Sequence, residues 1–544
     1  MGSPPARRAH AIGGGSEIFR GDCGCLGRYF VALLLAGFIG LSSQQAQYRA
    51  PTFSSDVSSG SFQISNSPPA GSPPNLVGEG GYILAMDSRV EPTGTPLHVY
   101  GGYHTRPEPI KFGSIVFPKG ATGDMDGLVY VADTSGFRWM KSIGRIGGKD
   151  AKVTAVAWES ATHLWIGGHC DGCNTPTTTD PSFVIPTLAM RTTGFLIRVD
   201  ASNGNFEFVK KLEPLDSVGK GFASVSSIAY DTALDEAYVA INHKGEVTYG
   251  DDPYTISDDA RVQKCSILVV SNIGGIAYGN ITAWSGTTTQ IAAATECRDI
   301  ALGVVSGDTT LFVTGQLIGT TSAALFGATT AFVTSGAANC FLWSIDSLYA
   351  TNWVKFLAGV PDTSTTSLGG AYGNAVAFNS QGGGKVIVGG GMWGQVTATS
   401  QGLTWTAAPA TSTESNAFVS TFTPTGIGES MHIFSGPSTA KAWVNDIVAV
   451  PDEVNWVVCG RYTESIKLND HIIFTKGSDQ NYTSVLNSEP PGYHPAMFIA
   501  KTGFAGDVMW ALQSEDSADP DHGHHSAEAT AVTYNKYTSG VQGD

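Results

Sequence analysis

The chain has 544 residues, of which 14% are charged and 67 are glycine, and its formal net charge at pH 7 is −16. This acidity argues against a nucleic acid as the main partner, because phosphate backbones are held by clusters of lysine and arginine. The length and the abundance of glycine favour a large, repetitive structure of short strands and turns over a helical protein.

Residues 1–50 are predicted to be a signal peptide or a signal anchor. Four arginines precede the apolar run YFVALLLAGFIGL, which extends from Tyr29 to Leu41. This run is shorter than the roughly 20 residues needed to span a bilayer, whereas a basic flank and a short apolar core are typical of a secretory signal. We therefore expect a secreted or cell-surface protein, held at a membrane only if this segment is an uncleaved anchor.

Residues 51–81 are rich in serine, proline and glycine and are predicted to be an arm. Such a composition cannot bury enough apolar surface to fold alone. Within the arm, GSFQIS (60–65) has the alternating pattern that could add a strand to another element.

From residue 82 onward, the sequence predicts a hairpin that recurs six times. Each copy has an apolar strand, a tight turn and a second apolar strand, as in VTAVAWESATHLWIGG (153–168). The residues that close the second strands lie 66 to 74 positions apart; they are Gly101, Gly167, Ile241, Gly315, Gly389 and Gly460. A second hairpin follows in nearly every copy, so one unit has four strands, a to d, with a long variable loop between b and c.

Six complete units and a partial seventh are expected within residues 82–544. The complete units span roughly 82–144, 153–212, 225–286, 298–358, 373–436 and 444–512, and the seventh begins at Ala527. A four-stranded antiparallel sheet with two apolar faces is unstable alone and must stack on similar sheets. The predicted fold class is therefore all-β, a β-propeller of six or seven four-stranded blades. The seventh blade is either completed by GSFQIS or left partial because the chain is a fragment, and a β-solenoid is the alternative architecture.

Two short segments resemble known propeller repeats. PAMFIAKTGFAGDVMWALQ (495–513), followed by ATAVTYN, resembles the repeat of SBBP-type β-propellers, in which a phrase such as F-V-A-K-x-x-x-x-G-x-x-x-W precedes an apolar strand. The resemblance extends over about residues 80–544, with degenerate copies outside unit six. It implies a secreted or surface-attached propeller and brings no common catalytic residue.

The segment ATSQGLTW (398–405) is similar to the Asp-box turn of sialidase-like propellers. Ser400 stands where that turn has its aspartate, and Ala398 stands where it has its serine. The segment therefore indicates a hairpin turn and not a glycosidase.

Six cysteines remain after residue 50, an even number that permits three disulfides. Cys170 and Cys173 form a Cys-x-x-Cys pattern. A local disulfide between them is favoured over free thiols and over a zinc site, because zinc needs a fourth ligand and a reducing compartment. Cys340 and Cys459 lie in apolar strands and are expected to be buried.

Two acidic stretches could bind a cation. The first, DSADPDHGHH, contains Asp519, Asp521, His522, His524 and His525. Imidazoles and carboxylates at this density can bind a divalent transition metal, but nothing in the sequence sets their geometry. We expect no cofactor and at most adventitious binding of a divalent metal. The second stretch, TGDMDG (122–127), lacks most acids of a calcium loop, so Asp124 and Asp126 are expected in a plain polar turn.

Three further residues are candidates for surface sites. Asn280 and Asn481 begin two sequons close to predicted turns and are candidate glycosylation sites in a secreted chain. Trp393 is expected to pack between blades instead of stacking on a sugar.

The sequence assigns no catalytic residue. It has no G-x-S-x-G in a strand-turn-helix context and no phosphate-binding glycine loop, and strand a shows no recurring acids with tyrosine or arginine. We expect a secreted or cell-surface scaffold that binds an extracellular protein or glycan through its b–c loops. The alternative is a hydrolase or lyase of extracellular polysaccharide, with carboxylates converging on the central channel.

Overall fold

The fold was examined in a computed structural model of the chain. It describes residues 60–62, 81–91, 95–104, 111–112, 115–116, 126–133, 136–143, 150–171, 192–215, 221–250, 255–256, 263–272, 276–282, 294–318, 338–359, 369–398, 403–406, 415–437, 441–450, 453–469, 472–475, 496–504, 507–514 and 531–532. The predicted signal segment lies outside these residues.

The described chain is all-β, as expected, and consists mainly of antiparallel meanders of four strands. Unit 1 contains β2 (Gly81–Val90), β3 (Pro96–His104), β6 (Asp126–Asp133) and β7 (Gly136–Ile143). Unit 2 contains β8 (Ala151–Trp158), β9 (His163–Asp171), β10 (Thr192–Asp200) and β11 (Phe206–Pro214). Unit 3 contains β12 (Phe222–Asp231), β13 (Glu236–Lys244), β16 (Lys264–Ser271) and β17 (Ile276–Thr282).

The same order continues in the second half of the chain. Unit 4 contains β18 (Ala294–Val305), β19 (Asp308–Ile318), β20 (Ala338–Ile345) and β21 (Thr351–Gly359). Unit 5 contains β22 (Gly370–Asn379), β23 (Lys385–Trp393), β26 (Asn416–Phe422) and β27 (Gly428–Phe434). Unit 6 contains β28 (Ala442–Val450), β29 (Asn455–Tyr462), β32 (Ala496–Gly503) and β33 (Val508–Ser514). In this described part, no helix is long and apolar enough to cross a membrane.

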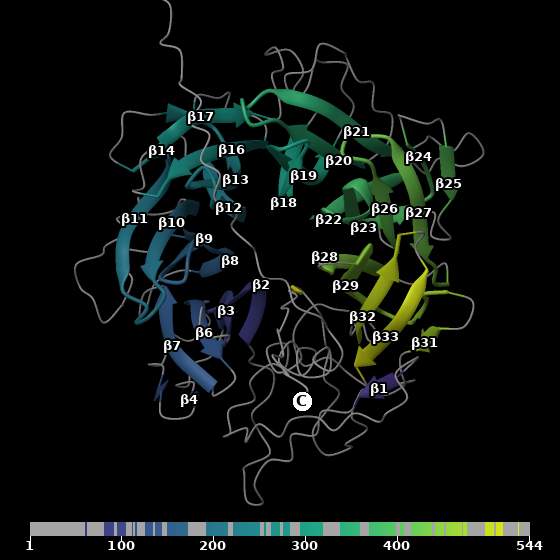
Figure 1. Ribbon diagram of the computed structural model, residues 1–544, viewed down its shortest axis with the longest axis horizontal. Helices are drawn as coiled ribbons and strands as arrows, with labels where there is room; N and C mark the ends of the chain where they lie inside the picture. The colour runs from purple at the N-terminus through teal and green to yellow at the C-terminus, as the bar shows by residue number, and fades with distance from the viewer. Residues whose placement is uncertain are drawn as a thin grey trace, which may run out of the picture.

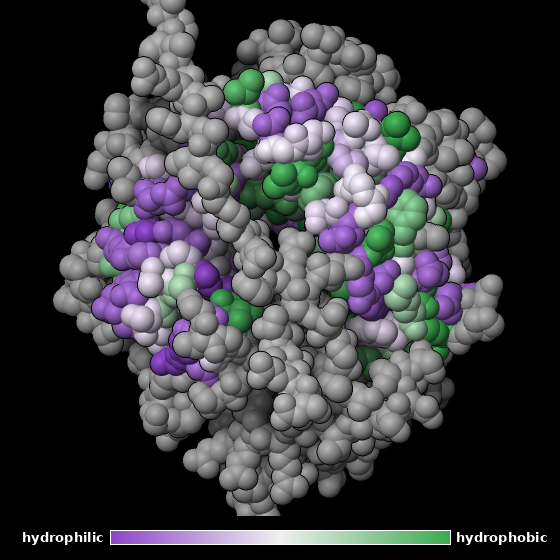
Figure 2. Space-filling view, in the orientation of Figure 1, coloured by the Kyte–Doolittle hydropathy of each residue, from purple (hydrophilic) through white to green (hydrophobic). Residues whose placement is uncertain are grey.

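The meanders are arranged around a common centre, and none of the sheets closes on itself (Figure 1). The first strands of the units, β2, β8, β12, β18, β22 and β28, lie nearest the centre and contact one another in chain order. We call these six the inner strands. On the face seen in Figure 2, hydrophobic residues line a hollow near the centre, and polar residues form much of the surrounding surface.

Short strands in the b–c loops join neighbouring units. After strand b of unit 3, β14 (Val247–Tyr249) pairs with β11, the outer strand of unit 2, and also with β15 (Thr255–Ile256). After strand b of unit 5, β24 (Gln395–Ala398) pairs in the same way with β21 of unit 4 and with β25 (Leu403–Thr406). The loops predicted as variable binding segments therefore also extend the preceding sheet.

Some of the remaining short strands also join one unit to another part of the chain. In the b–c loop of unit 6, β30 (Ser465–Lys467) pairs with β31 (Ile473–Thr475), and Lys467 bridges to Ser435 after the outer strand of unit 5. In unit 1, β4 (Lys111–Phe112) pairs with β5 (Ile115–Val116). From the arm, β1 (Gly60–Phe62) runs parallel to β33 and joins the outer edge of unit 6.

Small residues on strand b allow the next inner strand to approach closely. A Cβ on Gly389 would lie 2.7 Å from Ile447 Cδ1 and 2.8 Å from Val444 Cγ1, both on β28 of the next unit. Gly101 and Gly167 face the next inner strand in the same way, where Val153 and Val225 lie against them. In unit 4 the sizes are reversed, because Thr314 faces Gly373 of β22. Three of the glycines that revealed the periodicity of the sequence, Gly101, Gly167 and Gly389, thus serve the packing between sheets.

Candidate functional site

Each inner strand has a β-bulge at the same point in its pairing with strand b. The register shifts between Val153 and Ala155 in β8, for example, and equivalently in the other five inner strands. The register of the ladder skips one residue in each strand, namely Leu84, Thr154, Ser226, Arg298, Asn374 and Asn445. A bulge bends the strand and changes the direction of its side chains. Five polar side chains are therefore brought to one level of the inner strands.

The bulge residues connect neighbouring units by hydrogen bonds. Asn374 Nδ2 donates to the carbonyl of Val444, 2.8 Å away, which is the residue before the bulge of the next unit. Thr154 Oγ1 donates to the equivalent carbonyl, that of Val225. Arg298 Nη1 donates to Asn374 Oδ1, so it links two bulges directly. The first two contacts give backbone carbonyls beside the bulges a hydrogen-bond donor from the neighbouring unit.

Two aspartates directly follow the bulges of β18 and β28. Asp299 Oδ2 accepts a hydrogen bond from the backbone N–H of Val376 in unit 5 at 2.8 Å, and its Oδ1 accepts one from Ser227 Oγ of unit 3 at 2.9 Å. Asp446 Oδ2 accepts from the N–H of Val532 at 2.6 Å. Each aspartate therefore links its inner strand to a segment of a different part of the chain.

The carboxyl groups of the inner strands have raised pKa values. Desolvation by the surrounding protein raises the pKa of Asp299 to about 6, and it does the same for Asp87 on β2. The pKa of Asp446 lies well above its usual value, because of desolvation and then because of the negative charge of Asp299. All three residues nevertheless keep partial solvent exposure. Only Asp299 and Asp446 lie at equivalent positions, because Asp87 lies two residues further along its strand.

Each bulge has a side that faces the b–c loop. On that side, one position before the last pair that precedes the bulge, strands a and b of every unit have a residue pair at an equivalent position. We call these pairs the rim. They are Tyr82–Tyr103, Lys152–His169, Ser224–Asn242, Glu296–Gln316, Tyr372–Gly391 and Trp443–Arg461. None of the rim residues has an aliphatic side chain, whereas the adjacent strand positions supply the core. The rim is thus a level of aromatic, charged and amide residues at the b–c end of the inner strands.

Cations lie over aromatic rings at three places in the rim. Lys152 Nζ lies 4.9 Å from the ring centroid of Tyr103 in the preceding unit, and the guanidinium of Arg461 lies 4.0 Å from that of Trp443. Arg298, at the bulge, lies 5.0 Å from the ring of Tyr372. Such contacts are attractive and fix the position of the cation. They join neighbouring units in two of the three cases.

His169 is a rim residue whose surroundings lower its pKa. Burial, followed by the positive charge of Lys152, lowers its pKa, while Asp171 and Asp150 act in the opposite direction. Its Nδ1 is buried and has no hydrogen-bond partner in the described structure. His169 is therefore a neutral imidazole with an unsatisfied polar atom at the b–c end of unit 2.

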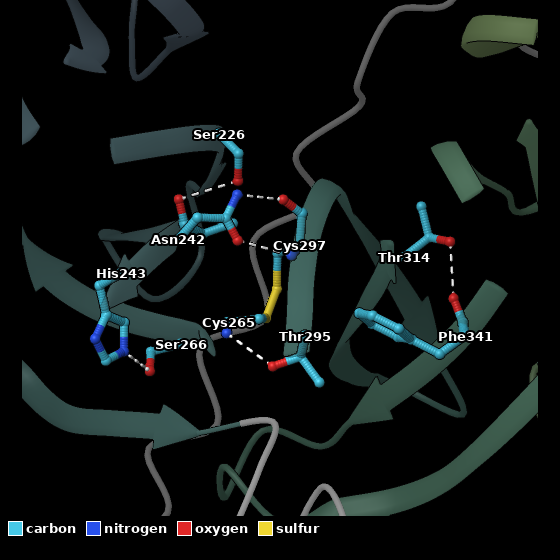
Figure 3. The surroundings of a disulfide bond; sticks show 10 residues. Ser226, Asn242, His243, Cys265, Ser266, Thr295, Cys297, Thr314 and Phe341 are labelled. Carbon is cyan, nitrogen blue, oxygen red and sulfur yellow. Dashed lines mark hydrogen bonds between the residues drawn. A yellow bond between two sulfur atoms is a disulfide. The ribbon is translucent and has the colours of Figure 1, made fainter. Parts of the chain in front are cut away.

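A disulfide between Cys265 and Cys297 joins unit 3 to unit 4 (Figure 3). Cys265 lies on β16 and Cys297 lies immediately before the bulge of β18, with a Cα–Cα distance of 5.2 Å. The side chain of Asn242 extends the junction, because its Nδ2 donates to Cys297 O and its Oδ1 accepts from Cys297 N, at 2.7 and 2.8 Å. The cysteine count had allowed such a bond, but the spacing did not reveal this pairing.

Several residues singled out from the sequence lie outside the described residues. They are Cys173, Asn481, Asp124, and the metal candidates Asp519, Asp521, His522, His524 and His525. The disulfide between Cys170 and Cys173, the glycosylation of Asn481 and the adventitious metal site therefore stay predictions. Among the residues that are described, no cluster of three or more histidines, cysteines or acids could hold a metal ion.

Other predicted residues have a defined place. Cys340 and Cys459 are buried, as expected, and Trp393 is buried too, beside Tyr372 of its own unit. Its packing between blades stays a prediction. Asp126 is not in a turn, because it begins β6 and is buried. Asn280 lies within β17, and its glycosylation remains a prediction.

The pairing of β24 with β25 agrees with the hairpin expected for the segment that contains Ala398 and Ser400. Comparison with protein-family models gives no match for this chain, and comparison with curated proteins gives none either.

Proposed function

We propose that the chain is a β-propeller of seven units, the seventh beginning at the segment that contains Val532. The hydrogen bond from Val532 N to Asp446 Oδ2 is equivalent to that from Val376 N to Asp299 Oδ2. Val532 therefore has the position beside unit 6 that Val376 of β22 has beside unit 4. Ala531 and Val532 are both buried there. The relation to SBBP-type propellers rests on the sequence phrase of unit 6 alone.

We further propose that the protein is a secreted or cell-surface scaffold that binds an extracellular protein or glycan at the b–c end of its units. The observation that carries this proposal is the rim, where aromatic rings and cations are gathered at one end of the inner strands. Binding residues of rigid β scaffolds commonly lie where long loops begin. The N-terminal basic and apolar segment supports secretion, with membrane attachment only through an uncleaved anchor.

The full-length coding sequence, expressed in a secreting host, tests both parts of the proposal. We expect the protein in the culture medium, and we expect the immobilised protein to retain an intact partner from a panel of polysaccharides and glycoproteins, with no change in glycan mass. The variant Arg461→Gln should weaken retention, whereas Lys385→Gln, at the opposite end of the strands, should not. Equal retention by both variants would contradict a site at the b–c end.

A polysaccharide hydrolase or lyase is the second candidate, because Asp299 and Asp446 interact electrostatically close to Arg298 and Tyr372. Paired carboxyl groups with separated pKa values are typical of glycosidases. However, both oxygens of Asp299 already accept hydrogen bonds from the protein, which favours a structural role. New low-mass sugars that disappear with Asp299→Asn would support the enzyme over the scaffold.

A further inference from the structure

We propose that the turns of units 3 to 5 form a second interaction surface, which binds a cationic amphipathic helix of a partner protein. These turns connect strand a to strand b and strand c to strand d, so they lie at the end of the strands opposite the rim. The inference therefore goes beyond the proposed function and does not depend on it. We use the name turn patch for Leu234, Val304 and Leu348, together with Ile427 at the edge.

The turn patch consists of aliphatic side chains that the fold leaves in solvent. Leu348, between β20 and β21, has 80% of its surface exposed, and Val304, near the end of β18, has 64%. Ile427, before β27, is 60% exposed, and Leu234, before β13, is 44% exposed. A single exposed aliphatic residue needs no explanation, but a contiguous apolar patch with a polar border is typical of a surface for protein interaction.

A hydrogen bond joins the turns of units 3 and 4, which are neighbours around the centre (Figure 1). The hydroxyl group of Tyr349, which follows Leu348, donates to Glu236 Oε2 at 2.9 Å. Glu236 begins β13 and lies two positions after Leu234. Leu234 and Leu348 are therefore each within two residues of the same hydrogen bond, although they belong to different units.

Within unit 4, the two turns lie side by side. The pairing of β19 with β20 extends to Leu311 and Ile345, and three positions further along each strand lie Asp308 and Leu348. Val304 pairs with the residue that follows Asp308 in β19. The turn with Val304 and the turn with Leu348 are thus adjacent at one end of the same sheet.

Unit 5 continues the surface. Trp353, near the start of β21 in unit 4, donates from its Nε1 to the carbonyl of Pro424 at 2.9 Å. Pro424 lies in the turn that also contains Ile427, and a Cβ on Gly426 of this turn would lie 2.7 Å from the Trp353 ring. The turn of unit 5 therefore packs on unit 4 beside the turn that contains Leu348, which places Ile427 at the edge of the patch.

The same turns carry negative charge and no positive charge. Their exposed or partly exposed carboxylates are those of Asp235, Glu236, Asp308 and Asp346. Residues 231–236, 304–309 and 345–351 include no lysine, arginine or histidine. In the part of the chain that the structure describes, these carboxylates accept hydrogen bonds only from uncharged hydroxyl, amide and backbone N–H groups. Their charges are therefore not balanced within the turns.

The combination of exposed aliphatic side chains and unbalanced carboxylates decides the kind of partner. An anionic membrane would be repelled, and a second copy of this chain would place carboxylates against carboxylates. A cationic amphipathic helix has an apolar face with lysines or arginines along its borders, so it complements both features of the surface.

The backbone of these turns is held in a defined geometry. Among the described residues other than glycine, those with positive φ are Asp235, Ser306 and Tyr349, at 59°, 54° and 63°. This conformation is unfavourable for a residue with a Cβ and persists where the surrounding structure fixes it. The hydrogen bond from Tyr349 to Glu236 is one such constraint. Because the turns are already ordered, binding at the patch requires little further ordering of the protein.

The test measures how an amphipathic helical peptide of leucine and lysine binds to the full-length protein, by fluorescence anisotropy of the labelled peptide. Two control peptides keep the pattern: one has glutamate in place of lysine, and the other has serine in place of leucine. We expect the leucine-lysine peptide to bind at least about tenfold more tightly than either control, because it alone matches both the apolar patch and the charge. Added salt should weaken its binding.

Two pairs of variants locate the site. Leu348→Ser should weaken binding of the leucine-lysine peptide about tenfold, whereas Ile473→Ser should not, although Ile473 on β31 is 59% exposed. Asp308→Asn should weaken binding about threefold, whereas Asp507→Asn, at an exposed position before β33, should not. Melting temperatures equal to that of the wild type would exclude a loss of fold in these four variants.

Two results would overturn the inference directly. Equal binding of the leucine-lysine and serine-lysine peptides would show only a general attraction of cations to an acidic chain. Equal effects of the patch variants and their controls would place the peptide elsewhere. The rim variant Arg461→Gln should leave peptide binding unchanged, so this test and that of the proposed function are independent.

Two other occupants are distinguished by further measurements on the same proteins. A dimer in sedimentation experiments that Leu348→Ser dissociates would identify a second copy of the chain as the occupant. Binding to phosphatidylglycerol vesicles that is lost in Leu348→Ser would identify a lipid surface. Either result would overturn the helix as the occupant of the turn patch.

Discussion

At the scale of single residues, the packing between neighbouring units combines two opposite kinds of side chain. Small residues of strand b let the next inner strand approach, while Asp299 and Asp446 place carboxylates between strands. A buried carboxylate is costly, and its raised pKa measures that cost. The hydrogen bonds from backbone N–H groups reduce the cost without removing it, because the pKa of Asp299 remains at about 6. These residues tie units together at the expense of some stability.

The pKa of Asp299 leads to a pH-dependent prediction. Its pKa of about 6 in the folded protein exceeds the ordinary aspartate value of 3.8, so between these values the folded protein holds a proton that the unfolded chain has released. Protonation therefore stabilises the fold as the pH falls through 6, and this contribution is lost as the pH rises. We expect the stability of the wild type, relative to Asp299→Asn, to increase by about 1 kcal/mol from pH 7 to pH 5, after allowance for partial solvent exposure.

Urea unfolding of both proteins at the two pH values measures this difference. Asp308→Asn, at an exposed position that begins β19, is the control and should follow the wild type. If the difference in the free energy of unfolding between wild type and Asp299→Asn is the same at pH 5 and pH 7, the carboxyl group does not titrate in that range.

Gly389 offers a second test at the scale of a residue. Alanine at this position would place its Cβ 2.8 Å from Val444 Cγ1 and 2.7 Å from Ile447 Cδ1. Overpacking of this kind costs about 1–3 kcal/mol of stability. The double variant Gly389→Ala and Val444→Ala should recover part of the loss, since the smaller side chain makes room. Chemical denaturation of the three variants gives the coupling energy, and a value near zero would show that the two residues do not meet.

At the scale of elements, the four-stranded meanders agree with the predicted hairpins, and the connections between meanders were not predicted. The pairing of β14 with β11 and of β24 with β21 extends one sheet with a strand from the next unit. A short strand in a loop has too few residues for a periodicity to be visible. The covalent link between Cys265 and Cys297 is a further connection of this kind.

Removal of this disulfide should destabilise the junction between units 3 and 4. The two cysteines are 32 positions apart in sequence, and closure of such a loop in the unfolded chain accounts for about 3–4 kcal/mol in the chain-entropy model. We expect Cys265→Ala with Cys297→Ala to lose about this amount in denaturation experiments. Cys340 is a buried cysteine outside this bond. The variant Cys340→Ala should therefore lower the free energy of unfolding only by the cost of the lost packing. Equal losses would argue against an intact bond between Cys265 and Cys297.

At the scale of the whole molecule, the contact between Val532 and Asp446 is the point on which the seven-unit proposal depends. Deletion of residues 527–544 would leave Asp446 Oδ2 without its backbone donor and would uncover the inner edge of unit 6. An unsatisfied buried acceptor costs about 1–3 kcal/mol. We expect reduced hydrogen-exchange protection in β28 and β29, and normal protection in β12 and β13.

Deletion of residues 535–544 is the matched control, because it keeps Val532. It should leave the protection of β28 unchanged. If both deletions, or neither, reduce the protection of β28, then Val532 is not what completes the edge of unit 6.

The sequence by itself determined the secondary structure of the units. Its apolar strands, tight turns and regularly spaced glycines were sufficient to locate β8 and β9, for example, because short-range patterns decide strand and turn. The tertiary structure alone decided the bulges, the alignment of the rim pairs, the carboxylates of Asp299 and Asp446, and the bond between Cys265 and Cys297. These features depend on which strands become neighbours across tens of residues, and contacts between units leave no periodic trace in the sequence.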